Sequence, residues 1–273
     1  MTNFILDIFK VSTIEIFYIT GMIILVGFLL GILENIINSN MQRAFGYKGI
    51  LITAWLGTPI HELGHAAMCV IFGHKISRMK LLQLNSGDGT LGFVEHSYNK
   101  NNIYQRIGNF FIGIGPIFSG ISALLIGLYL LLPNSINVFE NSFKNNITYN
   151  KVDLNLIKWS ILNSASLIKF IFTINNLSKI GFWVFILLAF AISSHIALSK
   201  PDIKGAQDGL ITLYILLIFS NTLAKYFSIN TLDYIIKITK YNAYFSSLLF
   251  MALIFSIISF FISCIAYYIR KLL

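Results

Sequence analysis

Long apolar runs with few charged residues dominate the chain, and their lengths predict its main elements. A helix needs roughly 20 apolar residues to cross about 30 Å of hydrocarbon. The runs predict about six such helices, over residues 16–33, 49–73, 106–140, 180–199, 209–224 and 242–269, with Pro133-Asn134 ending the third. The pattern therefore predicts an all-α, polytopic membrane protein.

Two segments depart from this pattern. Residues 152–179 contain lysines among many Ser and Asn residues, which favours an interfacial helix over a span. Residues 75–98 predict a small β-hairpin after the second apolar helix, with strands near 79–84 and 90–94 around a turn at 85–89. A plain connecting loop is the alternative. Since no linker or repeat divides the chain, residues 1–273 are expected to form a single membrane domain.

Composition strengthens the membrane prediction. Only 11% of the 273 residues are charged, against about 25% in an average soluble domain, and the mean hydropathy is +0.75. Such a chain lacks the polar side chains to cover a soluble globule, and its hydrophobicity excludes intrinsic disorder. A disulfide scaffold is excluded because Cys69 and Cys264 are the only cysteines and both lie in apolar runs.

The net charge of +9 raises the question of a nucleic-acid partner. Lys and Arg avoid the apolar runs and gather between them, most densely at Lys75, Arg78 and Lys80. This distribution favours contact with anionic lipid headgroups, and no nucleic-acid partner is expected. With six spans the 20 cations divide equally between the two sides, so the positive-inside rule assigns no orientation.

The second apolar run contains His61-Glu62-Leu63-Gly64-His65, the pattern H-E-x-x-H. Histidines four positions apart share one face of a helix and can bind one Zn²⁺, and the intervening Glu can act as general base on water. The five-residue pattern also occurs by chance in soluble helices. Inside an apolar run, however, three ionisable residues are costly, and one zinc site explains all of them.

A tetrahedral zinc site needs a third protein ligand. A metzincin would have His at the position of Ile71, and His74 lies about 13.5 Å beyond His65 along a continuous helix. Glu95 and His96 end the predicted hairpin, where no helical pattern supports a second ligand.

The segment 193–209 offers better candidates for the third ligand. His195, Asp202 and Asp208 lie there at the junction of two apolar runs, beside the helix-breaking Pro201. The competing interpretation is a short charged loop between two spans. The residues alone leave the three candidates open.

These motifs together resemble the site-2 protease family of intramembrane zinc metalloproteases, and most closely its compact bacterial members without a PDZ domain. The first match is the embedded His61-Glu62-Leu63-Gly64-His65-Ala66. The second is Gly113-Ile114-Gly115-Pro116-Ile117-Phe118-Ser119, similar to the family's glycine-proline motif, which often has Asn where this chain has Ser119. The third is Asp202, or less closely Asp208, without the usual Leu-Asp-Gly context. The resemblance covers roughly residues 50–210, expected to be the metalloprotease core.

The resemblance implies a function. His61, His65 and Asp202 would bind Zn²⁺, with Glu62 as the catalytic base. Gly113, Gly115 and Ser119 would contribute to substrate binding, and the hairpin would hold the substrate as an extended strand. The implied substrates are transmembrane or membrane-associated proteins, cleaved by a multi-pass protein of the bacterial plasma membrane. The resemblance says nothing about the oligomeric state.

Two alternatives remain at this point. Another class of membrane metalloproteases also displays H-E-L-G-H but takes a downstream Glu ligand, in a setting not found in this chain. A zinc- or proton-coupled transporter would explain His195 and Asp202, because such carriers place His and Asp within spans. It would not need Glu62 between two histidines at catalytic spacing.

Overall fold

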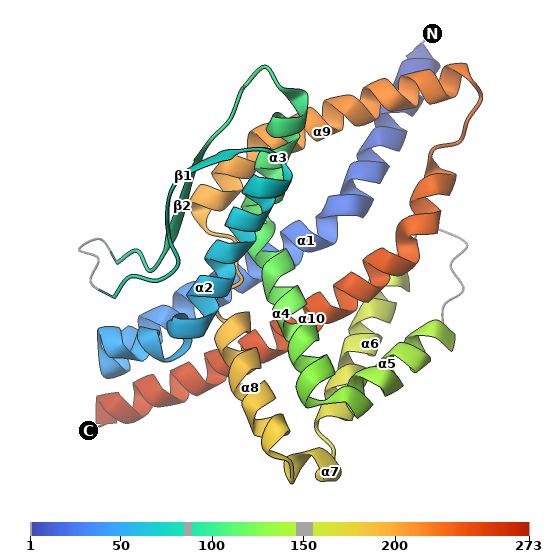
Figure 1. Ribbon diagram of the computed structural model, residues 1–273. Coiled ribbons are helices and arrows are strands. Elements are labelled where there is room, and N and C mark those ends of the chain that lie inside the picture. The colour runs from blue at the N-terminus through green and yellow to red at the C-terminus, as the bar shows by residue number, and fades with distance from the viewer. Residues whose placement is uncertain (1, 85–88, 146–154, 273) are drawn as a thin grey trace.

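A computed structural model describes residues 2–84, 89–145 and 155–272, and the chain is 82% helical. Its elements, in chain order, are α1 (Thr2–Phe45), α2 (Tyr47–Ile71), β1 (Lys75–Lys80), β2 (Phe93–Ser97), α3 (Ile103–Gly113), α4 (Gly115–Leu131), α5 (Pro133–Asn145), α6 (Asn155–Ile171), α7 (Ile174–Leu177), α8 (Ile180–Ser193), α9 (Lys200–Tyr226) and α10 (Leu232–Leu272) (Figure 1). Helices thus dominate the fold, as the apolar runs predicted.

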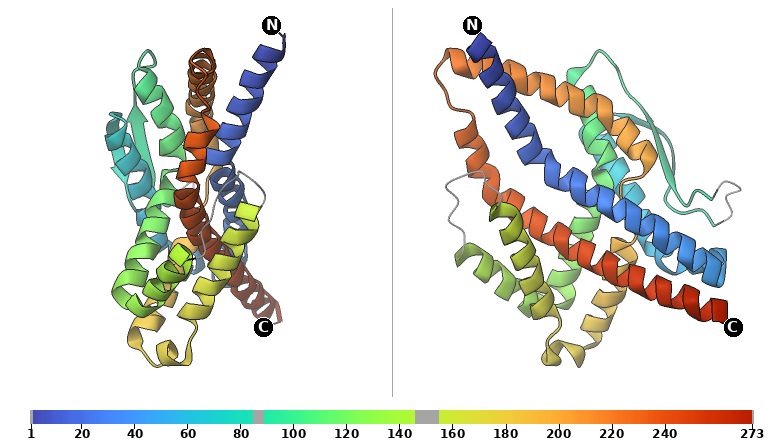
Figure 2. Two further views of the ribbon diagram at one scale, coloured as in Figure 1. Left: turned by 90° about the vertical axis from the view of Figure 1, so that its right-hand side faces the viewer. Right: turned by 180° about the vertical axis from the view of Figure 1, so that it is seen from behind.

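Two long helices, α1 and α10, run side by side in the same direction (Figure 2). Asn242 of α10 donates to the carbonyl of Tyr18 at 2.8 Å, and Asn40 of α1 donates to Ser263 at 3.2 Å near the other end. The third long helix, α9, runs back along the first part of α1, where Lys225 contacts Asp7 at 2.8 Å. Through α1, the N-terminal part of the chain thus packs against both of the last two helices.

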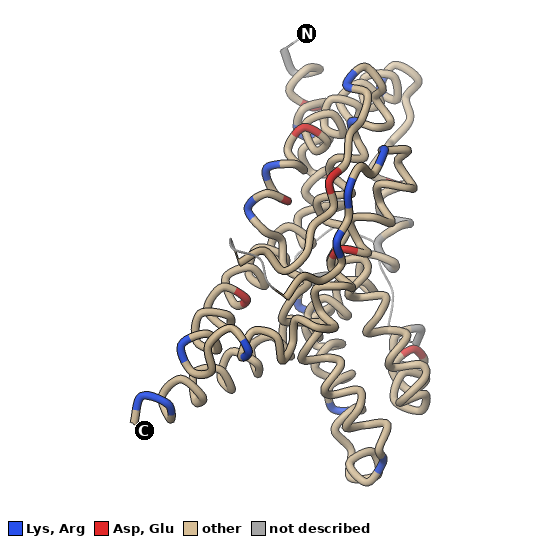
Figure 3. The backbone as a smooth tube through the Cα atoms, turned by 60° about the vertical axis from the view of Figure 1, so that its left-hand side comes forward, with Lys and Arg blue, Asp and Glu red and all other residues tan. Residues whose placement is uncertain are grey.

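Among the described residues, three helices are long and apolar enough to cross a membrane: Phe4–Phe45, Lys200–Tyr226 and Tyr241–Leu272. A fourth is possible if α3 and α4, bent by 56° relative to each other, form one span. Charged residues are correspondingly sparse along the backbone (Figure 3). The predicted spans 49–73 and 180–199 correspond to α2 and α8, and α8 has only 14 residues. The count of six therefore stays a prediction.

The third predicted span is divided into three helices. The chain bends at Ile114, between Gly113 and Gly115, and Pro116 lies in the first turn of α4. Because Pro lacks an N–H and clashes with the preceding turn, it fits best at a helix start. Pro133 likewise begins α5 after α4 has ended at Leu131, close to the predicted end of the span.

The segment predicted to be interfacial contains α6 and the short α7. α6 packs against α10 and α5, and its Ser160, Ser164, Leu167 and Ile171 are fully buried. The helix therefore belongs to the packed body, and its position relative to a membrane interface stays a prediction.

β1 and β2 form a two-stranded antiparallel sheet beside α2 (Figure 1). β1 lies earlier in the chain than predicted, at 75–80 instead of 79–84, and β2 lies later, at 93–97 instead of 90–94. Beyond them one hydrogen bond, from Gln83 N to Leu91 O at 2.7 Å, extends the pairing towards the predicted turn. Residues 85–88 of that turn lie outside the described residues.

Close contacts between glycines pack α2 against α4. A Cβ atom at Gly115 would lie 2.6 Å from the backbone oxygen of Gly64, and one at Gly64 would lie 2.5 Å from that of Gly115. Only residues without side chains permit backbones to approach this closely. Gly64 belongs to the H-E-x-x-H motif, so this contact fixes the position of the motif within the protein.

Candidate metal centre

Helix α2 places the two histidines of the motif side by side. His61 and His65 are one helical turn apart, so both rings project from one face. Their Nε2 atoms lie 3.1 Å apart and the ring centroids 4.9 Å apart. The local helix thus brings together two nitrogen donors.

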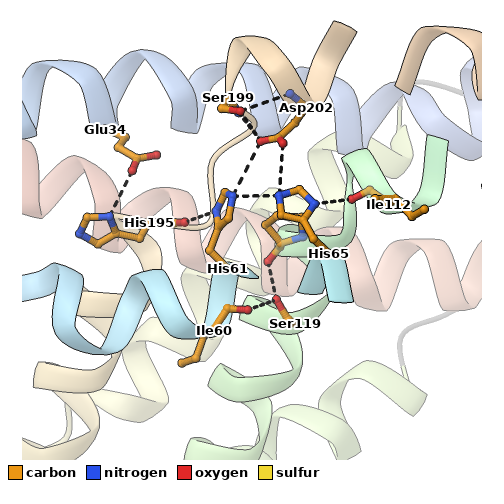
Figure 4. Close-up of polar contacts among 10 residues, drawn as sticks. Glu34, Ile60, His61, His65, Ile112, Ser119, His195, Ser199 and Asp202 are labelled. Carbon is orange, nitrogen blue, oxygen red and sulfur yellow. Dashed lines mark hydrogen bonds and ion pairs between the residues drawn. The ribbon is translucent and has the colours of Figure 1, made fainter. Parts of the chain in front are cut away.

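The N-terminus of α9 supplies the third group. Asp202 Oδ1 lies 3.2 Å from His65 Nε2, and Asp202 Oδ2 lies 3.8 Å from His61 Nε2 (Figure 4). Ser199 caps the helix: its Oγ accepts from Asp202 N, while Ser199 N donates to Asp202 Oδ2 at 2.8 Å. This capping box fixes the carboxylate that faces the histidines.

The other nitrogen of each ring is held by a backbone carbonyl. His61 Nδ1 donates to the oxygen of His195, and His65 Nδ1 donates to that of Ile112, both at 2.7 Å. Since a carbonyl oxygen can only accept, both Nδ1 atoms carry the proton. In the neutral rings both Nε2 atoms then present lone pairs towards each other and Asp202.

This donor set fits a zinc ion. Zinc bonds of about 2.0–2.2 Å at tetrahedral angles place ligand atoms roughly 3.3 Å apart. Here His65 Nε2 lies 3.1 Å from His61 Nε2 and 3.2 Å from Asp202 Oδ1, and His61 Nε2 lies 3.8 Å from the other carboxylate oxygen, Oδ2. With one ligand atom taken from each residue, the three atoms all lie within 4.8 Å of one another. Two imidazoles with carbonyl-bound Nδ1 atoms and one carboxylate are typical of zinc ligation. His61, His65 and Asp202 could therefore hold a metal ion.

Glu62 lies beside these groups in a cavity of about 990 Å³. The cavity wall combines α1, α2, the α9 N-terminus and the segment from Gly89 to Val94. Glu62 is only 6% exposed. A Cβ atom on Gly92 would lie 2.7 Å from Glu62 Cγ, so the chain before β2 packs directly on this glutamate.

The competing ligand candidates are occupied elsewhere. The His195 ring is 2% exposed and contacts Thr53 Oγ1 at 2.9 Å and Glu34 Oε1 at 3.2 Å, so only its backbone oxygen serves the site. Asp208 forms an ion pair with Arg106 at 2.9 Å. The structure brings Asp202, and neither of these two side chains, to the histidine pair.

Two other acidic or imidazole groups considered in the sequence also lie away from the histidine pair. Glu95 pairs with the exposed Arg78 at 2.8 Å. His74 contacts His96 and the carbonyl of Gln105. Neither Glu95 nor His74 contacts His61 or His65 among the interactions of the described residues.

The three residues predicted to bind substrate occupy different positions. Gly113 lines the cavity, and a Cβ there would lie 2.7 Å from Ala206 Cβ and 2.7 Å from the backbone oxygen of Asp202. Gly115 contacts Gly64, as described above. Ser119 donates to the carbonyl of Ile60 at 2.7 Å (Figure 4). These contacts hold helices together, and the substrate-binding role of the three residues stays a prediction.

The residues around the candidate ligands carry only a weak signal in the sequence. Glu34 of α1 lines the cavity and binds the His195 ring, yet in the sequence it only marks the end of the first apolar run. The carbonyl of Ile112 offers no sequence signal, because any residue could supply it. The one available indication of Glu34 is that it is an acidic residue at the border of a predicted span.

The chain matches no protein-family model, no curated protein and no solved structure. Its function must therefore be inferred from the geometry of the site.

Proposed function

We propose that this protein is an intramembrane zinc metalloprotease of the site-2 protease type, located in a bacterial plasma membrane. The observation that carries the proposal is the convergence of His61, His65 and Asp202 beside Glu62, within a cavity bordered by β2. Its substrates would be transmembrane or membrane-proximal proteins.

The chemistry follows from the donors and their neighbour. Zinc, when bound, supplies a Lewis acid that polarises a peptide carbonyl and acidifies water. Glu62 lies next to His61 in the chain and is nearly buried, so its carboxylate can take a proton from the attacking water and pass it to the leaving amine. His195 and Ile112 hold the two rings through their carbonyls, which keeps the Nε2 atoms directed at the metal position.

Substrate binding requires a local change in the substrate. A transmembrane helix bonds its own carbonyls, so a scissile peptide must unwind before water can attack it. The freed backbone groups need new partners, and the segment from Gly89 through β2 lines the cavity beside Glu62. Extended pairing along this segment would supply those hydrogen bonds.

The main experiment compares membranes from cells that express the wild type or Glu62→Gln. Glu62→Gln removes the base but leaves all three ligands, so we expect loss of cleavage with one zinc per chain retained. Quantitative membrane proteomics would then reveal a protein that accumulates intact only with the variant. Proteolysis by Glu62→Gln at the wild-type rate would rule the proposal out.

Metal content distinguishes the protease from a zinc transporter. A protease holds one zinc through purification, whereas a transporter releases its ion readily. Elemental analysis of purified wild-type protein, before and after dialysis against a weak chelator, separates the two. Rapid loss of all zinc, together with metal flux in proteoliposomes, would favour transport.

A further inference from the structure

A second pair of histidines, His74 and His96, has no role in the proposed chemistry, and His96 lines the cavity. His74 lies between α2 and β1, and His96 lies on β2 and forms part of the cavity wall. Their Nδ1 atoms are 3.0 Å apart, and His74 Nε2 lies 2.7 Å from the carbonyl oxygen of Gln105.

The proton positions of this pair follow from the carbonyl. Gln105 O can only accept, so His74 Nε2 carries the proton and, in the neutral ring, Nδ1 is an acceptor. His96 Nδ1 must then donate to it, which leaves a lone pair on His96 Nε2. Burial, His74 and His65 all lower the pKa of His96, in agreement with a neutral ring.

Several contacts hold this pair rigidly. The Tyr98 ring stacks on His74, with centroids 5.0 Å apart and an interplanar angle of 16°. The Gln105 side chain donates to Gly73 O at 2.8 Å and accepts from Asn99 N at 2.7 Å, which joins the chain before β1 to the chain after β2. A group positioned in this way needs little reorganisation to bind a ligand.

An irregularity in the sheet coincides with His96. The pairing of β1 with β2 shifts between Ile76 and Arg78, opposite His96 and Glu95. Ser77, at the shift, donates to Glu95 O at 3.1 Å. Bulges of this kind change the direction of neighbouring side chains and are common beside active sites.

The position of His96 relative to Glu62 suggests what it contacts. Gly92 packs on Glu62, and His96 lies four residues further along the same segment. At about 3.3 Å per extended residue, this separation is roughly 13 Å. Gly92, Phe93, Val94 and His96 all line the same cavity. An extended substrate beside this segment would therefore reach His96 about four residues from its scissile bond.

We propose, on the basis of the protease function above, that His96 is a substrate-binding residue. Its Nε2 accepts a hydrogen bond from a donor on the substrate about four residues from the cleaved bond. The donor is a backbone N–H or a side-chain O–H or N–H. An unwound chain in a low-polarity cavity leaves such donors without partners, and an unsatisfied buried donor weakens binding.

Two substitutions at one position test this role. His96→Asn keeps an amide near Nδ1 that can donate to His74, but it removes the Nε2 acceptor. His96→Gln places its amide oxygen near the Nε2 position. In proteoliposomes with zinc-loaded full-length protein, we expect His96→Asn to lower kcat/KM about tenfold or more, mainly through KM. His96→Gln should restore cleavage to within a few-fold of the wild type.

The probe is a synthetic transmembrane peptide spanning the cleavage site of the protein that accumulates with Glu62→Gln. One series methylates single backbone nitrogens, and a second replaces single side-chain donors with apolar residues of similar size. At one position, removal of the donor should slow the wild type and have no effect on His96→Asn. The series that shows this effect identifies the donor as backbone or side chain.

Three outcomes would overturn the role of His96. The first is a kcat/KM of His96→Asn equal to that of the wild type. The second is equal impairment of both variants together with lowered zinc content or thermal stability. The third is that removing a donor from the peptide, at any position, leaves cleavage by the wild type unchanged. The last result does not depend on the folding of any variant. Failure of the protease proposal is distinct, because Glu62→Gln would then cleave as the wild type does.

Discussion

At the scale of single residues, the centre depends on which atoms carry protons. The carbonyls of His195 and Ile112 fix the proton on Nδ1 of both rings, so two lone pairs and the Asp202 carboxylate face one another within a few ångströms. Ser199 donates to Asp202 Oδ2, but without a cation or an added proton none of the three groups can donate to another, and facing acceptors without a donor are costly. A bound metal would therefore stabilise the arrangement.

The assignment of Asp202 as the third ligand can be tested by substituting two aspartates of the same helix, Asp202 and Asp208, one at a time. Asp202→Asn keeps an oxygen able to accept from Ser199 but removes the charge, so we expect zinc affinity to fall about 100-fold or more. Asp208→Asn weakens only the ion pair with Arg106, and its zinc affinity should match the wild type. Competition with a fluorescent chelator measures both. Equal affinities in both variants would contradict the assignment of Asp202.

Glu34 lies one step further from the candidate metal position. Its carboxylate holds the His195 ring, and the His195 carbonyl holds His61. Glu34→Gln weakens the first of these bonds, so zinc affinity should fall about tenfold, at the lower end for residues behind the ligands. The same chelator competition measures it. Asp7→Asn, on the same helix but exposed and remote, is the control and should leave zinc affinity unchanged.

At the scale of elements, the closeness of α2 and α4 sets the position of the motif. Gly64 and Gly115 contact each other through backbone atoms, and a Cβ on Gly115 would also lie 3.1 Å from His65 N. Backbone atoms cannot move aside as the end of a flexible side chain can. Any added side chain must therefore separate the helices and displace His65.

Gly115→Ala should consequently destabilise the protein by about 1–3 kcal/mol and reduce zinc affinity at the same time. Gly21→Ala in α1 is the matched control, because the nearest atom to its Cβ would be Phe17 Cδ1 at 3.7 Å. That control should be neutral or stabilising by up to about 1 kcal/mol, since Ala favours helix over Gly. Thermal unfolding in detergent, with and without chelator, compares the two. If Gly115→Ala were as stable as the wild type, α4 could move away from α2 without cost, which would contradict this prediction.

At the scale of the whole molecule, α1, α9 and α10 form the frame. α1 has 44 residues and α10 has 41, so each is about 60–66 Å long, roughly twice the thickness of the hydrocarbon. A helix of this length that crosses a bilayer must tilt or extend beyond it. Their parallel packing brings Asn40 and Cys264 within 3.4 Å, although they are far apart in the sequence.

This arrangement predicts a cross-link. With Cys69 replaced by Ala, Asn40→Cys should form a disulfide with the native Cys264 under mild oxidation. Peptide mass spectrometry would detect it. Phe17→Cys in the same background is the control, because Tyr18 lies near Asn242, at the opposite end of the contact. Linkage from Phe17→Cys instead would show that α1 and α10 do not run parallel.

Local patterns in the sequence were enough for part of this protein. The spacing of His61 and His65 places both on one helical face wherever that helix lies, and apolar runs form helices in any apolar surroundings. The helix break near Pro133 was also local, because the ring of Pro itself prevents continuation.

Long-range packing decided the rest. Residues 202 and 208 are six positions apart, which on a helix is a rotation of about 240°, so Asp202 faces the histidines while Asp208 faces Arg106. Nothing local selects which face turns towards α2. The His195 ring, directed at Glu34 and Thr53, was likewise unpredictable, since its orientation depends on α1 and α2 together.

The sequence by itself determined the helical character of the chain, its sparse charge and the histidine pair with Glu62, because each depends on residues a few positions apart. Only the tertiary structure decided that Asp202 completes the centre, that carbonyls orient the rings, and that the segment before β2 covers Glu62. These features join segments distant in the chain, and their energies come from packing between helices, for which a single sequence carries no local signal.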